Sequence, residues 1–221
     1  MDFGDSVVIE PSGRSRGTVI WLHGLGADGH DFEPLARQWD LAARHGIRFV
    51  LPHAPVRPVT LNGGMRMRAW YDILGLDLDA REDEAGIRQA QDRVQALIDA
   101  ARDGRDQPVL LAGFSQGGAL ALHTGLRQAR PLAGILALSA YLPLAPRLAG
   151  EMDPRARATP VRVDHGRQDN IVPLAMAERS VARLRELGVA VEFNLYDMGH
   201  SLCPPQVDSL YHWLRARFGS A

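Results

Sequence analysis

The stretch VLLAGFSQGG, from Val109 to Gly118, contains the strongest indication of the fold. It begins as a continuous apolar run, which is typical of a strand buried on both faces of a parallel sheet. It then passes through G-x-S-x-G, from Gly113 to Gly117, into a helical pattern. Small residues two positions before and after Ser115 permit the sharp strand-to-helix turn that presents a nucleophilic hydroxyl. Serine is also a common helix N-cap, so the prediction of a nucleophile depends on the flanking strand and helix.

Apolar β-rich runs and helical patterns alternate along the rest of the chain. This alternation predicts right-handed crossovers and an α/β fold with a mostly parallel central sheet covered by helices on both faces. No internal repeat and no Gly/Ser-rich linker divides the sequence, so we expect residues 1–221 to form a single domain. The predicted strands are 7–9, 18–22, 48–51, 109–112, 134–138, 161–164 and 189–196, and the predicted helices are 32–44, 82–101, 116–127, 174–187 and 205–218.

Two long connections interrupt this alternation. The segment 52–79 far exceeds the usual loop of about 4 to 6 residues, and apolar loops of this length are usually functional. Flexible methionine side chains accommodate varied shapes, which favours contact with an apolar acyl group. The same side chains could instead close the edge of the core. The second connection, 141–159, is too short for a large cap domain. The apolar side chains of the first are Met65, Met67, Trp70, Tyr71, Leu74 and Leu76.

Composition excludes several classes of function. The net charge is −1, which provides no basic surface for nucleic acid. All 25 basic residues are arginines, and without lysine a Schiff base, a Ser-Lys dyad and a P-loop are impossible. Cys203 is the only cysteine, so an internal disulfide and a thiolate metal cluster are excluded. No apolar run approaches the ~20 residues that cross a bilayer, and residues 1–16 lack a signal-peptide pattern, so we expect a cytoplasmic protein.

A nucleophilic serine needs a base, and eight histidines are available. His23, His30, His45 and His53 precede the serine, which is an unusual order for this turn. His123 would lie about 12 Å further along the serine's own helix, and His212 falls within the last helix. His165 closes a strand and is expected to shape the turn behind it. His200 remains, in a loop between the last predicted strand and the final helix.

The acid is expected after the preceding strand, in the chain order Ser, Asp, His. The loop HGRQDNIVP follows strand 161–164 and contains Asp169. Asp164 still lies in the strand and Asp197 is a near neighbour of the histidine, so both rank below Asp169. A turn-forming aspartate before Asn170 is the structural alternative.

The glycine-rich stretch WLHGLGADG allows two interpretations. Gly24, Gly26 and Gly29 match the G-x-G-x-x-G of a dinucleotide-binding turn, but that turn needs an acidic residue ~20 positions later, and the next strand ends Leu51-Pro52 without one. The other interpretation is an oxyanion-binding loop, whose Leu25 N–H pairs with the N–H of Gln116 after the nucleophile. A metal site from His23, Asp28, His30 and Asp31 is weaker, because H-E-x-x-H and clustered cysteines are lacking.

Six motifs then occur in order: HGLGADG, NGGMRMRAWYDI, REDEAGI, GFSQGG, HGRQDNIVP and GHS. From about Thr18 to the last helix, the chain resembles the small carboxylesterases of the α/β-hydrolase superfamily that are related to acyl-protein thioesterases and lysophospholipases. The resemblance implies an acyl groove bordered by the segment 61–76, and weak dimers. Arg162 and Asp164 stand where relatives usually have a more apolar strand. The implied catalytic triad is Ser115, Asp169 and His200, with oxyanion donors at Leu25 and Gln116.

We therefore expect hydrolysis of esters or thioesters with apolar acyl groups through an acyl-enzyme, without a cofactor or metal. The substrate is a small ester, a lysolipid or an acylated protein, and the expected substrate-binding residues are Met65, Met67, Trp70 and Leu74. Two alternatives are a non-catalytic binding protein on the same fold and, with less support, a dinucleotide-dependent oxidoreductase. The physiological substrate, its chain length and the oligomeric state stay open.

Overall fold

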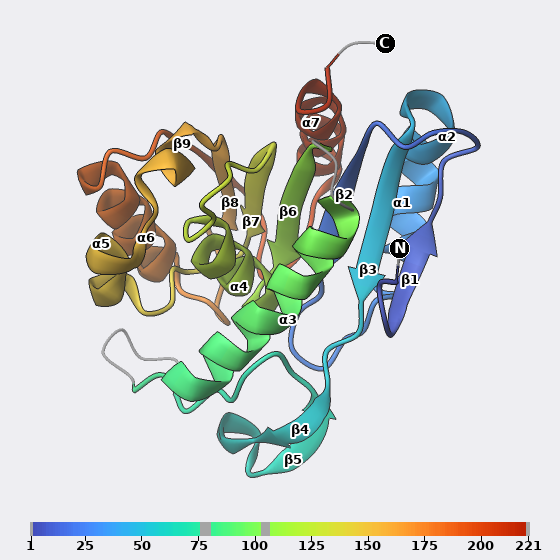
Figure 1. The fold of residues 1–221 in the computed structure, drawn as a ribbon. Coiled ribbons are helices and arrows are strands. Elements are labelled where there is room, and N and C mark those ends of the chain that lie inside the picture. The colour runs from blue at the N-terminus through green and yellow to red at the C-terminus, as the bar shows by residue number, and fades with distance from the viewer. Residues whose placement is uncertain (1, 76–80, 103–106, 220–221) are drawn as a thin grey trace.

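A seven-stranded sheet forms the centre of the protein (Figure 1). The computed structural model describes residues 2–75, 81–102 and 107–219, so Leu76 lies outside the described residues. The strand order is β1-β3-β2-β6-β7-β8-β9, and only β1 runs antiparallel to its neighbour. The strands are β1 (Ser6–Ile9), β2 (Gly17–Leu22), β3 (Ile47–Pro52), β6 (Val109–Phe114), β7 (Gly134–Leu138), β8 (Val161–Gly166) and β9 (Val191–Tyr196). The predicted α/β architecture with a mostly parallel sheet is confirmed.

Helices cover both faces of the sheet and create two apolar clusters. Ile20 and Leu22 of β2 belong to the cluster under α3 and α4, whereas Val19 and Trp21 belong to the cluster under α1, α2 and α7. Alternate side chains of a strand point to opposite faces, so a strand buried on both faces must be apolar throughout. The helices are α1 (Glu33–Trp39), α2 (Leu41–His45), α3 (Glu84–Arg102), α4 (Gln116–Gly125), α5 (Leu148–Glu151), α6 (Leu174–Glu186) and α7 (Pro204–Ala216).

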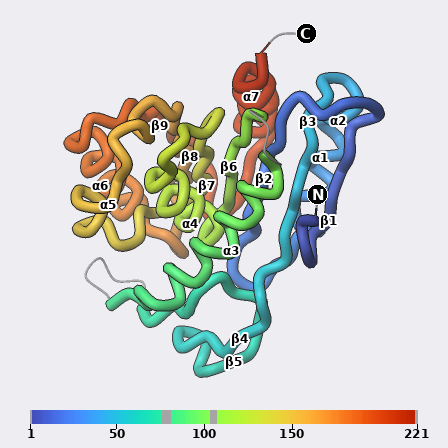
Figure 2. The backbone as a smooth tube through the Cα atoms, viewed as in Figure 1, coloured from blue at the N-terminus to red at the C-terminus, as the bar shows by residue number. Residues whose placement is uncertain are grey.

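The long connection after β3 contains a β-hairpin, which the sequence analysis did not predict. Strands β4 (Val56–Val59) and β5 (Met65–Arg68) pair antiparallel as a separate two-stranded sheet. Figure 2 shows this hairpin projecting beyond one end of the large sheet. Gly63 and Gly64 have φ angles of 65° and 82° between the strands, a conformation that glycine adopts without a steric cost. These two glycines therefore make the turn possible.

The helix expected over 32–44 is two helices, α1 and α2, so the prediction of one continuous helix is wrong. The break is at Asp40, whose φ is 53°. Its N–H bonds to the carbonyl of Arg37 and ends α1. Trp39 and Leu41 on either side are both buried, so the apolar pattern continues across the break and hides it.

The polar residues of β8 form a buried ion pair. Arg162 donates from Nε and Nη2 to the two carboxylate oxygens of Asp164, at 2.8 and 2.9 Å. Asn194 on β9 donates to the same carboxylate at 2.9 Å. A buried charge is tolerated when it is paired and hydrogen-bonded. All six residues of β8 are consequently buried, despite the departure from an apolar pattern.

The other connection, 141–159, consists of short helical turns and α5 rather than a large cap. No helix among the described residues is long and apolar enough to span a membrane.

Candidate active site

Ser115 occupies a strained turn between β6 and α4. Its φ of 54° and ψ of −120° are unusual for a residue with a side chain. The turn is fixed on both sides, because its N–H donates to Leu138 O at 2.8 Å and its carbonyl accepts from Ala119 N at 3.0 Å. Strain of this kind persists only where the surroundings impose it, and it concentrates at functional sites. Ser115 is thus held at the end of a central strand, as predicted for a nucleophile.

Glycines flanking Ser115 permit close backbone packing. A Cβ added at Gly113 would overlap backbone atoms of Gly117, and one added at Gly117 would overlap the Leu22 carbonyl. The first glycine therefore allows the turn to close on itself. The second allows α4 to lie against the end of β2.

Asp169 and His200 form a hydrogen-bonded pair. The two residues lie in the loops after β8 and β9, which are neighbours in the sheet. His200 Nδ1 lies 2.7 Å from Asp169 Oδ2, and the Asp169 side chain is fully buried. Asp169 Oδ1 accepts from the N–H groups of Ile171 and Val172, each at 2.9 Å. The carboxylate is fixed by three donors, which is the arrangement required to orient a base.

The structure brings His200 beside the serine turn through Phe114. The rings of Phe114 and His200 are 4.8 Å apart, and Phe114 directly precedes Ser115. The described contacts join His200 to Asp169 by a hydrogen bond and to the serine turn by this ring contact, not by a hydrogen bond to Ser115. Catalytic hydrogen bonds often tighten only when substrate binds.

The glycine-rich loop after β2 lies against the serine turn. A Cβ added at Gly24 would lie 3.5 Å from the Ser115 Cβ. The Gly24 carbonyl accepts from His23 Nδ1 at 2.7 Å, which directs the Leu25 N–H of the same peptide in the opposite direction. The Gly26 N–H is already bonded to Arg68 O at 2.9 Å. The Gln116 N–H lies in the first turn of α4, where the helix offers it no acceptor. The assignment of Leu25 and Gln116 as the two oxyanion donors stays a prediction.

Two side chains hold segments around the serine turn together in ways that the sequence analysis did not predict. Gln116 accepts from Trp70 N at 2.9 Å and donates to Tyr71 O at 2.8 Å, so it fastens the segment after β5 to α4. His23 accepts from Ala54 N at Nε2, and burial lowers its pKa, so the ring is neutral and Nδ1 carries the proton. Both residues lie in recognised motifs, but motifs do not reveal the partners that folding supplies.

The four expected substrate-binding residues differ in position. Met65 and Leu74 are 64% and 39% exposed, whereas Trp70 is only 3% exposed. The Trp70 Nε1–H donates to His23 O at 2.9 Å, so this residue braces the oxyanion loop. Met67 also lies close to this loop, with its sulfur 3.8 Å from a Cβ built on Gly26. Contact of any of the four with substrate stays a prediction.

Of the alternative metal site, His30 bonds to a residue outside the set. His30 bonds to Glu33 Oε2 at 2.7 Å through Nδ1, and its N–H bonds to Asp28. Across residues 2–75, 81–102 and 107–219, no three or more His, Cys, Asp or Glu side chains are grouped to hold a metal ion.

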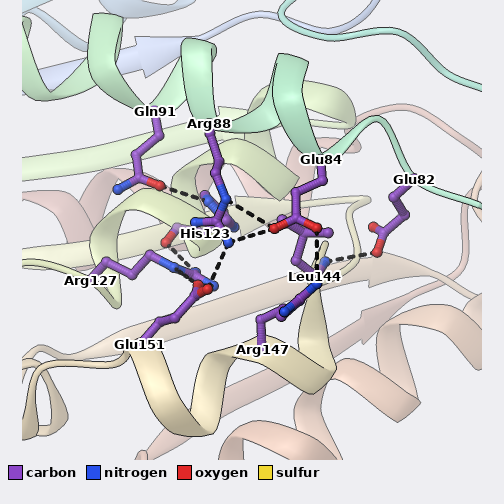
Figure 3. Close-up of polar contacts among 9 residues, drawn as sticks. All are labelled: Glu82, Glu84, Arg88, Gln91, His123, Arg127, Leu144, Arg147 and Glu151. Atoms are coloured by element: carbon purple, nitrogen blue, oxygen red, sulfur yellow. Dashed lines mark hydrogen bonds and ion pairs between the residues drawn. The ribbon is translucent and has the colours of Figure 1, made fainter.

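His123 is fully buried in a polar network (Figure 3). Its Nε2 bonds to Gln91 Oε1 at 2.9 Å, and burial lowers its pKa to about 3. The neighbouring Glu151 of α5 pairs with Arg88 of α3 and with Arg127, which follows α4 and donates to the His123 carbonyl in it; both ion pairs are 2.7 Å long. The network therefore joins three helices, and His123 is a structural residue within it.

Comparison with known proteins gives a consistent result. A family model described as Phospholipase/Carboxylesterase matches residues 3–217. The chain is 39% identical over 218 residues to acyl-protein thioesterase 1 of Neurospora crassa, covering 92% of this chain and 88% of that protein. It is also 39% identical over 230 residues to acyl-protein thioesterase 1 of Mycosarcoma maydis, covering 95% of each.

Solved structures agree with these sequence matches. The crystal structure of Zea mays acyl-protein thioesterase 2 is similar with a TM-score of 0.87 at 31% identity, covering 98% of this chain and 100% of that one. Arabidopsis thaliana SOBER1 is similar with a TM-score of 0.86 at 31% identity, covering 93% of this chain and 99% of that one.

Proposed function

The chain belongs to the phospholipase/carboxylesterase family of ester-hydrolysing α/β-hydrolases, and we propose that Ser115, His200 and Asp169 carry out its chemistry. The bonded pair of Asp169 and His200 beside a strained serine is the observation that supports this assignment. An oxidoreductase or a binding protein would not require that arrangement.

The mechanism follows from the positions of these groups. His200 Nε2 accepts the Ser115 proton as the oxygen attacks the acyl carbon, and Asp169 holds the imidazole with its proton on Nδ1. The resulting oxyanion accepts from the N–H groups of Leu25 and Gln116. The leaving thiol or alcohol takes the proton from His200, and an ester to Ser115 remains. Water activated by His200 then attacks that ester, which releases the acid and restores the serine.

We propose thioesters of apolar acyl groups, including acylated proteins, as the preferred substrates. Two observations favour them over small polar esters: the relatives named acyl-protein thioesterase, and the exposed Met65 near Met67 at the hairpin. An apolar acyl chain gains roughly 0.8 kcal/mol for each CH₂ group that becomes buried. A lysophospholipid presents the same acyl chain through an oxygen ester and is the second candidate.

Rates with and without the serine hydroxyl test the assignment. Wild type is compared with Ser115→Ala and Asp169→Asn on p-nitrophenyl esters from acetate to palmitate, an acyl thioester and a lysophospholipid. We expect a loss of at least about 10³-fold with Ser115→Ala and about 10⁴-fold with Asp169→Asn, on every substrate. Full activity of Ser115→Ala would remove the proposal. The ratio of thioester to lysophospholipid rates decides between the two substrate classes.

We also propose a cytoplasmic location and a weak homodimer. Val56, Leu61 and Met65 on the hairpin are exposed apolar side chains, and such clusters commonly mark association surfaces. Sedimentation velocity over a hundredfold range of concentration tests the dimer, and a constant monomer mass would refute it. Fractionation of the source cells tests the location.

A further inference from the structure

His165 is a fully buried imidazole that the proposed mechanism does not use. It lies in β8, four residues before Asp169. Its Nε2 is 2.8 Å from the carbonyl oxygen of Val172, and because a carbonyl only accepts, Nε2 must carry a proton. Its Nδ1 is buried without a hydrogen-bond partner among the described residues, so a second proton there would be unpaired. Burial accordingly lowers the pKa of His165, and the ring is a neutral donor through Nε2.

The same nitrogen also faces the carboxylate of Asp169. His165 Nε2 lies 3.6 Å from Asp169 Oδ2, the oxygen that accepts from His200. Two imidazoles therefore converge on one carboxylate oxygen, at 2.7 and 3.6 Å. The nearer one is His200, the proposed base, and the farther one is His165, whose Nε2 is bonded to the Val172 carbonyl.

Val172 provides a second link between His165 and Asp169, in addition to their direct approach. Its N–H donates to Asp169 Oδ1 at 2.9 Å, and its carbonyl accepts from His165. Both hydrogen-bonding groups of this residue are thus fixed, one by the acid and one by His165. The loop that carries the acid cannot rotate without breaking the His165 bond.

We propose that His165 is a positioning residue for the catalytic acid, acting on His200 only through Asp169. This inference rests on the proposed function. His165 closes the acid loop by donating its Nε2–H to the Val172 carbonyl, and its ring lies beside Asp169 Oδ2. Because the ring is neutral, it fixes the loop that holds the carboxylate without adding a cation beside the His200 imidazolium that forms during reaction. The residue therefore contributes to turnover rather than to substrate affinity.

Two polar substitutions test whether the position of the N–H donor matters or only the presence of a polar side chain. The terminal amide of glutamine reaches about as far as Nε2 of histidine, whereas that of asparagine falls short. We expect His165→Gln to retain kcat within about threefold. We expect His165→Asn to lower kcat about 10- to 100-fold with KM changed less than about twofold, as for small displacements of catalytic groups. Equal losses with both variants, or a loss confined to KM, would overturn the proposal.

His123 supplies the matched control. It is equally buried and also bonded through Nε2, but its partner is Gln91 in the network of Figure 3. His123→Asn should lower the thermal unfolding midpoint at least as much as His165→Asn and leave kcat within about threefold. If it lowers kcat as much as His165→Asn does, a general loss of packing explains both results and the proposal is wrong.

A double-mutant cycle tests whether His165 acts through the acid. His165→Asn is measured in the wild-type and Asp169→Asn backgrounds. In the wild-type background we expect His165→Asn to lower kcat about 10- to 100-fold. In the Asp169→Asn background we expect it to lower kcat by less than about threefold further, because the effects of residues that act together are not additive. An equal fold-loss of kcat in both backgrounds would overturn the inference while leaving the assigned triad intact. Full activity of Asp169→Asn alone would refute the assigned acid and the inference with it.

Discussion

Gly117 shows how a single missing side chain determines the geometry of the site. It follows Gln116 in α4, and a Cβ there would overlap the carbonyl of Leu22 and approach that of His23 to 2.6 Å. These are backbone atoms, so they cannot move aside as a flexible side chain would. The absence of a Cβ lets the end of β2, which leads into the oxyanion loop, pack directly on the serine turn.

Gly117→Ala should therefore be destabilising and inactivating. Overpacking typically costs about 1 to 3 kcal/mol, and the shift it forces would separate Ser115 from the Leu25 N–H. Urea unfolding and ester hydrolysis measure the two effects. Gly150→Ala is the matched control, because a Cβ there meets nothing within 4 Å and alanine favours a helix by about 0.5 to 1 kcal/mol. A Gly117→Ala protein as stable and active as wild type would contradict this account.

Individual residues differ in how well their roles could be predicted from the sequence. Ser115, Asp169 and His200 were selected by motif and chain order, and the structure joins the last two directly. The bracing roles of Gln116 and His165 depend on partners distant in the sequence or on a backbone carbonyl. No periodicity encodes such partners, so only the folded chain reveals them.

At the scale of elements, the network in Figure 3 joins α3, α4 and α5. Glu151 is its centre, since its two oxygens bond separately to Arg88 and Arg127 at 2.7 Å. Hydrogen bonds from these guanidinium groups lower the pKa of Glu151 to about 2. The network holds the segment after β7 against the helix that begins at the nucleophile.

Glu151→Gln should destabilise the protein at neutral pH. The depressed pKa means that the stabilisation is fully present above the unfolded pKa near 4.5 and is lost as the pH falls toward about 2. Charge-assisted bonds of this type contribute about 1.5 to 3 kcal/mol, so urea unfolding at pH 7 should show a deficit within that range. The difference in unfolding free energy between wild type and Glu151→Gln should shrink as the pH falls from 4.5 to 3.

Glu186→Gln provides the comparison for this prediction. Glu186 bonds to Arg183 at 3.0 Å, but its side chain is 64% exposed. Exposed ion pairs contribute about 0 to 1 kcal/mol. Equal deficits for the two variants at pH 7, or no deficit for Glu151→Gln, would show that the network does not stabilise the three helices.

Elements with strong periodicity were predicted well, and irregular ones were not. All seven strands of the large sheet were predicted: β2, β6 and β7 are almost wholly buried apolar runs, and the less buried β1 and β9 are still rich in β-branched or aromatic residues. The hairpin was missed because its strands have mostly exposed or partly exposed side chains and pair only with each other. The break at Asp40 was missed because it requires a left-handed aspartate, which leaves no apolar signature.

At the scale of the whole molecule, the sheet order brings the site together. Strands β2, β6, β7, β8 and β9 are parallel neighbours, so the loops after them meet at one edge. Residues 115, 169 and 200 follow β6, β8 and β9 and therefore share that edge. Ligand sites of open parallel sheets form at this edge.

That residues 1–221 form a single domain stays a prediction, which cooperative unfolding tests. Urea unfolding followed by tryptophan fluorescence and by far-UV circular dichroism should give one shared midpoint, because the two apolar clusters lie on opposite faces of the same sheet. Two separated transitions would indicate independently folding parts.

The most direct test of the central claim is to identify the acylated residue during turnover. The protein is mixed with an octanoyl thioester, quenched in acid within milliseconds, digested and examined by mass spectrometry, with Cys203 as the competing acceptor. We expect one octanoyl group on Ser115 in the wild type and none in Ser115→Ala. An octanoyl group on Cys203 or another residue, with Ser115 unmodified while product forms, would contradict the account.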